Sequence, residues 1–407
     1  MQAEAIMREA QKYSNQIKDF RRKLHQNAET GFDLKYTVAF VKQELIKLGL
    51  NPEDCGKSGI SAYISGKNTG KVFLLRADMD ALPVTEETDV EFKSQNGKMH
   101  ACGHDTHTAM LLGAAAILTS HKDELEGTVK LMFQPAEELL EGAKDMLENG
   151  ILDNPKVDAG LMIHIMAGMP FETGTVIVSA PGVSAPAADY FKIDIHGKGC
   201  HGSMPNTGAD PITAAAHILV GLQAIQAREI GMNDRAAMTI GNVQAGSAAN
   251  VIPDTVSMAG TLRAFDEETR EFMKKRLVDI STGTAEVFRT KAEVTFTSGC
   301  PTLVNDKILS VCISKYMKEL LGDNKAFSVT ELNERGGGSA SKTSGSEDFA
   351  YISHALPSVM LALAGGKPED GYSYPQHHPM VKFDENALPV GSAVYAYSAM
   401  RWLEDNK

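Results

Sequence analysis

Residues 128–138, TVKLMFQPAEE, join a short, largely apolar run to a polar turn. The first part, 128–133, has the length of a buried strand. The runs 71–75 and 159–163 are of the same kind. A helical pattern at 106–118 lies between the runs 71–75 and 128–133. Apolar strands that alternate with helices indicate an α/β fold whose sheet is covered by helices on both faces. We therefore predict a mixed, mostly parallel sheet between helices.

The pattern changes after Pro186. Between Asp189 and Phe296 the predicted order is strand, helix, two strands, helix and strand. This βαββαβ order is typical of ferredoxin-like α+β units, and the segment has the size of a small domain. The α/β pattern resumes after Gly299. We predict that residues 1–185 and 299–407 form one discontinuous domain and that residues 186–298 form a domain inserted into it.

Composition excludes several classes of protein. The chain has 407 residues, 43% of them hydrophobic, and a formal net charge of -12. So acidic a chain is poorly suited to nucleic acids or to anionic membrane surfaces, and no run is long enough to span a bilayer. We recognise no signal peptide, and the five scattered cysteines favour free thiols in a reducing cytoplasm.

The segment MHACGHD, residues 99–105, is the strongest local motif. Cys102 and His104 can present a thiolate and an imidazole to one metal ion. A helix is predicted to begin just after them, and a helix N-terminus lowers the pKa of a thiol. We expect Asp105 to accept a hydrogen bond from a ligand imidazole. The alternative is a chance pairing of Cys and His in a loop.

Three other segments carry candidate ligands. Glu137 and Glu138 follow the strand 128–133, so one carboxylate can bind metal while its neighbour acts as a base, unless both are simply a solvated surface pair. His164 follows the predicted strand 159–163, where a structural histidine is the commoner case. The loop QHHP contributes His377 or His378.

The joint placement of these segments matters more than any one of them. Most follow predicted strands, and the carboxyl ends of parallel strands share one edge of a sheet. RADMDALP, residues 76–83, ends another strand, and we expect Asp80 to support a ligand rather than to be one. A set of Cys, His and Glu favours Zn, Co, Ni or Mn over Mg or Ca.

Two glycine-rich stretches are decoys. Residues 197–202 fit G-x-G-x-x-G, but Pro205 and a polar loop stand where a dinucleotide site needs a helix. Residues 336–343 nearly match a phosphate-binding loop, but Ser341 replaces a required glycine and no apolar strand precedes them. We therefore exclude dehydrogenase and nucleotide triphosphatase functions. No G-x-S-x-G motif is present, so a serine hydrolase lacks its nucleophile signature.

HACGHD, QPAEE, RADMDALP, GSEDF (residues 345–349) and HHP, in the family's order along nearly the whole chain, resemble the M20 metallopeptidase clan. They are most similar to its aminoacylase and hippurate hydrolase branch. The resemblance implies a catalytic domain with two divalent metal ions and an inserted lid domain that also forms a homodimer contact. It assigns the ligands Cys102, His104, Glu138, His164 and His377, with His378 as the alternative at the last position.

The same resemblance implies roles for other side chains. Glu137 is the general base, His201 stabilises the oxyanion, and Asn250 and Arg263 hold the substrate carboxylate. The residues Cys200, Gly202, Asn206 and Ala167 depart from the commonest family pattern, which bears on substrate preference more than on chemistry.

The expected reaction is hydrolysis of the amide bond in an N-acyl amino acid, releasing a carboxylic acid and a free amino acid. The first alternative is a metallo-dipeptidase or carboxypeptidase acting on short peptides. The second is a binding protein with a structural metal, but such sites are usually closed sets of four closely spaced ligands. A dispersed set with a spare glutamate favours catalysis.

Overall fold

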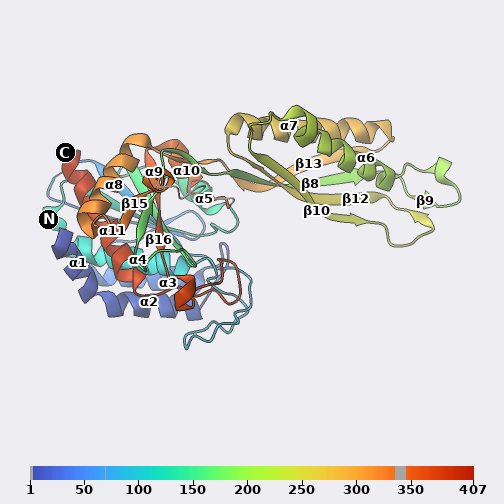
Figure 1. Cartoon of the computed structure of the whole chain (residues 1–407). Coiled ribbons are helices and arrows are strands. Elements are labelled where there is room, and N and C mark those ends of the chain that lie inside the picture. The colour runs from blue at the N-terminus through green and yellow to red at the C-terminus, as the bar shows by residue number, and fades with distance from the viewer. Residues whose placement is uncertain (1–2, 69, 335–344) are drawn as a thin grey trace. The chain divides into compact units, whose positions relative to one another are not determined.

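The structure, a computed structural model, describes residues 3–68, 70–334 and 345–407. The chain divides into two compact units, and Figure 1 colours it from blue at the N-terminus to red at the C-terminus. Within the described residues, the first unit lies in the ranges 3–184, 304–334 and 347–407, and the second in the ranges 185–303 and 345–346. The glycine-rich decoy at 336–343 lies outside the described residues. The assignment of a catalytic role to one unit and a lid role to the other stays a prediction.

The first unit is built on an eight-stranded mixed sheet with the order β1-β2-β4-β3-β5-β16-β6-β15. Its central strands β4, β3, β5 and β16 are parallel, whereas β2 pairs antiparallel with β4 and β6 pairs antiparallel with β16. This confirms the predicted mixed sheet. The strand bounds are β1 Glu53–Cys55, β2 Gly59–Ser65, β3 Val72–Asp78, β4 Thr128–Gln134, β5 Ala159–Met166, β6 Val176–Val178, β15 Ala326–Ser328 and β16 Ser358–Ala364.

Helices cover this sheet, and its central strands are therefore buried along their length. α4 (His104–Ser120) and α11 (Ala387–Asp405) pack against each other and against β3, and both are almost wholly buried. α5 (Gly142–Glu148) packs against β4 and against α10 (Ala350–Ala355). The unit also contains α3 Lys35–Lys47, α8 Lys307–Leu321 and α9 Val329–Glu334, besides the two N-terminal helices described below. In the described part of the chain, no helix combines the length and the apolar character needed to cross a membrane.

At the N-terminus, the chain forms α1 (Ala3–Lys12) and α2 (Ser14–Gln26), which are divided at Tyr13, and α2 packs on α4. One local expectation needs correction. His164 does not follow a strand but lies inside β5. Pairing with β16 extends β5 to Met166, so that His164 is opposite Ala362.

The second unit has the order β8, α6, β10, β12, α7 and β13, and its sheet has the spatial order β10-β12-β8-β13 with every pair antiparallel. This is the predicted ferredoxin-like arrangement. α6 and α7 pack together over the sheet, and apolar side chains such as Phe191 and Leu277 fill the space between. The bounds are β8 Ala187–His196, α6 Pro211–Ala224, β10 Ala236–Ala245, β12 Thr255–Ala264, α7 Glu267–Val287 and β13 Lys291–Cys300.

Candidate metal centre

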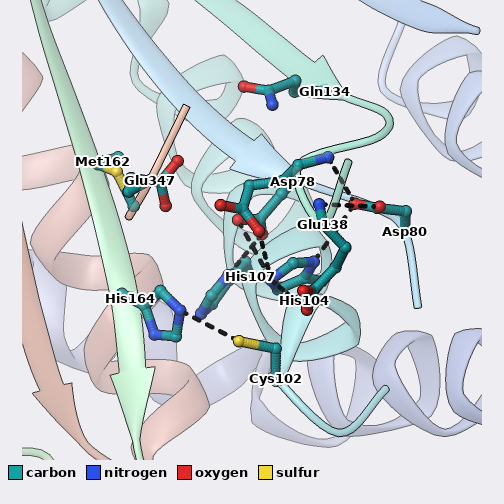
Figure 2. A network of polar contacts seen from close by, with 12 residues as sticks. Asp78, Asp80, Cys102, His104, His107, Gln134, Glu138, Met162, His164 and Glu347 are labelled. Atoms are coloured by element: carbon teal, nitrogen blue, oxygen red, sulfur yellow. Dashed lines mark hydrogen bonds and ion pairs between the residues drawn. The ribbon is translucent and has the colours of Figure 1, made fainter. Parts of the chain in front are cut away.

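The candidate site lies in the first unit, where β3 and β4 end and α4 begins. Parallel pairing sets Asp78 opposite Gln134, so the RADMDALP and QPAEE segments leave the sheet side by side. His104 is the first residue of α4, and the preceding Gly103 has the positive φ of 92° that lets the chain turn into the helix. Figure 2 shows Cys102, His104, Glu138 and His164 converging on one region.

Five predicted ligands form what we call the ligand cluster. Cys102 lies with His104 and His164 in one group, and with Glu138 and His377 in another; in each group one ligand atom per residue lies within 4.8 Å of the others. His104 forms a third such group with Glu137 and Glu138. The structure therefore brings together side chains that are up to 275 positions apart in the sequence, from Cys102 to His377.

The imidazole of His164 is oriented for binding a metal. Its Nδ1 lies 2.7 Å from the carbonyl oxygen of Ile165, so Nδ1 carries the proton and donates it to that oxygen. The lone pair of Nε2 consequently faces the Sγ of Cys102 at 3.5 Å. Burial and the neighbouring His107 lower the pKa of His164 to about 3, which keeps the ring neutral.

His377, not His378, belongs to the cluster. The backbone of His377 has a φ of 67°, its amide donates to the carbonyl of Ala101 at 2.9 Å, and its Nε2 lies 3.5 Å from Glu138 Oε1. His378 instead stacks on Tyr374 with ring centroids 4.4 Å apart, and its Nδ1 accepts a hydrogen bond from the amide of Met380.

The ligand cluster has polar atoms that no protein atom satisfies. Both ring nitrogens of His104 and Oε1 of Glu138 are buried without a hydrogen-bond partner. An unsatisfied buried polar group costs free energy, so such atoms need another partner. Thiol, imidazole and carboxylate around these orphaned atoms fit a divalent metal of the zinc type.

Glu137 lies beside the ligand cluster. Of the five ligands, it groups with His104 and Glu138. Burial raises its pKa well above the usual range, and the charges of Glu347 and Glu138 raise it further. Asp80 fixes the turn that carries both glutamates: its two oxygens accept the amides of Glu137 at 3.0 Å and of Glu138 at 3.2 Å. Asp80 also lies 3.4 Å from Nδ1 of His104.

Behind the ligand cluster lies a second buried polar group, the Arg76 cluster. The Arg76 side chain is 1% exposed and donates to Gln134, Asp78, Glu347 and Asp348 at 2.8–3.3 Å. Asp348 also accepts from the Gln134 side chain and from the amide of Ala143. The GSEDF segment thus serves as a scaffold here, a role that the sequence pattern did not indicate.

His107 is a second residue that sequence reasoning missed. Its Nε2 accepts the amide of Ile165 at 2.8 Å, so the proton is on Nδ1, which donates to Asp78 at 2.5 Å. With both nitrogens engaged, His107 is a structural histidine. Its position three residues after His104 was the available signal.

Two expectations about residues 102–105 are wrong. Asp105 does not touch a ligand imidazole; its Oδ2 accepts from Arg21 at 3.1 Å and from His25 at 2.9 Å. The Cys102 thiol pKa is raised, first by burial and then by the charge of Glu138, so the helix N-terminus does not by itself ionise the thiol.

The predicted substrate-binding residues all lie in the second unit. His201 is exposed on the two-residue strand β9 (Cys200–His201), which pairs with β11 (Val251–Ile252); the amide of the next residue, Gly202, donates to the carbonyl of Asn250. Arg263 is separate, on β12, where Nη1 donates to the Ser346 hydroxyl at 2.6 Å. The unit thus brings His201 and Asn250 together.

Comparison with known proteins agrees with this chemistry. The sequence profile of peptidase family M20/M25/M40 matches residues 74–401. N-acetyl-L-cysteine deacetylase of Bacillus subtilis is 38% identical, covering 96% of this chain and 89% of that protein. Thermostable carboxypeptidase 2 of Saccharolobus solfataricus is 34% identical over 98% of both chains. The crystal structure of the Bacillus subtilis YXEP protein, a dinuclear metal binding peptidase from the M20 family, has a TM-score of 0.77 at 32% identity and covers 97% of this chain and 99% of that chain.

Proposed function

The chain belongs to peptidase family M20/M25/M40, and from this premise we propose that it hydrolyses the amide bond of N-acyl amino acids. The products are a carboxylic acid and a free amino acid. The single observation that carries this proposal is the ligand cluster with the spare carboxylate of Glu137 at its side. The choice of an N-acyl amino acid is supported by the similarity to an N-acetyl-L-cysteine deacetylase.

We assign two divalent metal ions to Cys102, His104, Glu138, His164 and His377. The three groups overlap in pairs, through Cys102, Glu138 and His104, and this supports a pair of ions rather than one. The similarity to a dinuclear family member supports the same count. The soft and borderline donors favour Zn, Mn, Co or Ni.

Within the proposed reaction, Glu137 is the general base. When bound, divalent metal ions polarise a carbonyl group and lower the pKa of water. Glu137 takes a proton from the attacking water and returns it to the leaving amine, because its carboxylate lies beside the ligand cluster without being needed in it. Asp80 holds the backbone of Glu137 so that this carboxylate stays in place.

The second unit supplies the substrate contacts in this proposal. The Ser203 amide donates to Nδ1 of His201 at 3.2 Å, so the proton is on Nε2, which suits donation to an oxyanion. Arg263 and Asn250 bind the carboxylate of the amino acid. His201 acts in the active site of a partner subunit of a homodimer. The long edge strand β10 and the exposed side chain of Val220 on α6 support association through this unit.

A peptidase acting on dipeptides or peptide C-termini is the second candidate. It uses the same groups, and the 34% identity to a thermostable carboxypeptidase favours it specifically. We place either enzyme in the cytoplasm, in keeping with five free cysteines. The net charge of -12 argues against nucleic acid as a partner.

The test measures amino acid release from a panel of N-acyl amino acids and dipeptides. Chelated enzyme is assayed before and after addition of Zn, Mn, Co or Ni. Release from N-acyl amino acids that depends on added metal is the expected result. Release from dipeptides alone would favour the peptidase, and metal-independent release would contradict the proposed centre.

A further inference from the structure

A buried ionic network links α2 to the segments that carry the candidate ligands. We call Arg21, His25, Glu86 and Asp105 the α2 network; each residue is at most 4% exposed. Oδ2 of Asp105 accepts from Nε of Arg21 at 3.1 Å and from Nδ1 of His25 at 2.9 Å. Nε2 of His25 lies 3.1 Å from Glu86 Oε2.

The geometry sets the charge of His25. Both of its ring nitrogens face carboxylate oxygens, and an ionised carboxylate only accepts hydrogen bonds. Both nitrogens therefore carry protons, and the ring is an imidazolium. The four residues carry two cations and two anions, and Nη1 of Arg21 also lies 3.5 Å from Glu385 Oε1, so removing one buried member leaves its partners without their counter-charge.

One end of the network fixes the start of α4. Asp105 directly follows His104, and successive helical residues point about 100° apart, so the direction of Asp105 determines the direction of His104. Asp105 is turned toward α2, which leaves His104 facing Asp80 and Glu137. Only Gly103 separates Cys102 from His104 in the sequence.

The other end fixes the loop that carries His377. Glu86 accepts hydrogen bonds from the Thr88 hydroxyl and the Ser94 amide, which anchors a loop without regular structure. The neighbouring Glu87 amide donates to the carbonyl of Pro379 at 2.9 Å. Nη1 of Arg21 donates to the carbonyl of Phe383 at 3.0 Å. The segment from His377 to Phe383 is thus held at two points by groups that the α2 network positions.

We propose that Arg21 and His25 are positioning residues of the metal centre, acting through Asp105 on Cys102 and His104 and through Glu86 on the His377 loop. The proposal rests on the metal assignment made under the proposed function. Neither residue touches a ligand side chain. Their role is to hold two separate ligand segments in place relative to each other. This placement sets the affinity of the centre for its ions.

The test compares two arginine variants that carry the same substitution. Arg21→Gln removes the guanidinium from the α2 network, and Arg270→Gln removes the guanidinium from the buried pair with Asp189 in the second unit, where the two bonds are 2.7 and 2.8 Å. Affinity of the apo-proteins for Zn²⁺ and Mn²⁺ is measured by competition with a chromophoric chelator, beside the thermal midpoint of each. His25→Gln is the second variant of the network.

Arg21→Gln and His25→Gln are expected to weaken metal binding by about 10- to 100-fold. Arg270→Gln is expected to lower the thermal midpoint while metal affinity stays within about twofold of wild type, because it breaks a buried ion pair in the unit that carries none of the proposed ligands. Metal affinity within about twofold of wild type for both network variants would overturn the proposal. If Arg21→Gln does not fold, His25→Gln and the charge-preserving Arg21→Lys decide the question. Wild-type protein that binds no metal would contradict the proposed function instead.

Discussion

The Arg76 cluster and the ligand cluster are adjacent, buried and strongly polar, yet they differ in how their atoms are satisfied. Every charged member of the Arg76 cluster has hydrogen-bond partners within the protein. In the ligand cluster, both nitrogens of His104 and one oxygen of Glu138 have none. In these two clusters, the network that is complete within the protein acts as a scaffold, whereas the network with missing partners is the proposed place for bound metal.

Glu137 stands between the two clusters, so its replacement gives the largest expected effect. Glu137→Gln should lower kcat by about 1,000-fold or more, because a neutral amide does not accept the proton of the attacking water. Metal content should stay unchanged, since the five ligands remain. The rates and the metal content are measured together, with Glu148→Gln, an exposed change at the end of α5, as the control. Wild-type turnover in Glu137→Gln would remove it from the base role.

Breaking the Arg76 cluster should affect stability instead of chemistry. Arg76→Met should lower the free energy of unfolding of the apo-protein by about 3–5 kcal/mol, because it leaves the buried carboxylates of Glu347 and Asp348 without their cation. Urea unfolding measures the loss. The matched control is Arg22→Met, whose partner Glu385 forms a surface pair, and there we expect about 1 kcal/mol or less. Equal losses in the two variants would contradict the distinction.

The α2 network should show itself in the pH dependence of stability. Burial lowers the pKa of His25, but its hydrogen bond to Asp105, the charge of Asp105 and its hydrogen bond to Glu86 more than offset this and raise the pKa to about 9. A raised pKa in the folded state adds stability that is complete below pH 6.5, the ordinary value, and is lost as pH rises through about 9. The expected loss is about 3 kcal/mol.

This loss is measured by urea unfolding of the apo-protein between about pH 6 and pH 10, a range that spans the two pKa values. Subtracting the same curve for His25→Gln cancels the other titrating groups. A difference that does not change with pH would mean that His25 is neutral in the folded protein.

The smallest expected effect has the opposite sign. Glu138→Gln removes a buried carboxylate with an unpartnered oxygen, so the apo-protein should gain about 1 kcal/mol of stability while losing most of its affinity for metal. Thermal midpoints with and without added Zn²⁺ test both effects. A variant clearly less stable than wild-type apo-protein would show that Glu138 belongs to the scaffold.

Much of this arrangement could be predicted because strands and motifs are local. The strands 128–133 and 159–163, the βαββαβ insertion and the segments around Cys102 and Glu138 are visible as short patterns. The role of Asp105 was not predictable, because its partners Arg21 and His25 lie about 80 positions earlier and only the packing of α2 on α4 brings them near. Likewise, the choice of His377 depends on a backbone with positive φ that no pattern of residue types indicates.

The two hydrogen bonds that Asp80 accepts have a consequence for redesign. Its oxygens hold the main-chain amides at positions 137 and 138 and leave the two side chains untouched. The backbone conformation of the turn is thus held by contacts that do not involve the side chains at positions 137 and 138. The side chains at these two positions can therefore be replaced, by design or in evolution, while the backbone of the loop is kept. The turn can thus carry side chains of different reactivity.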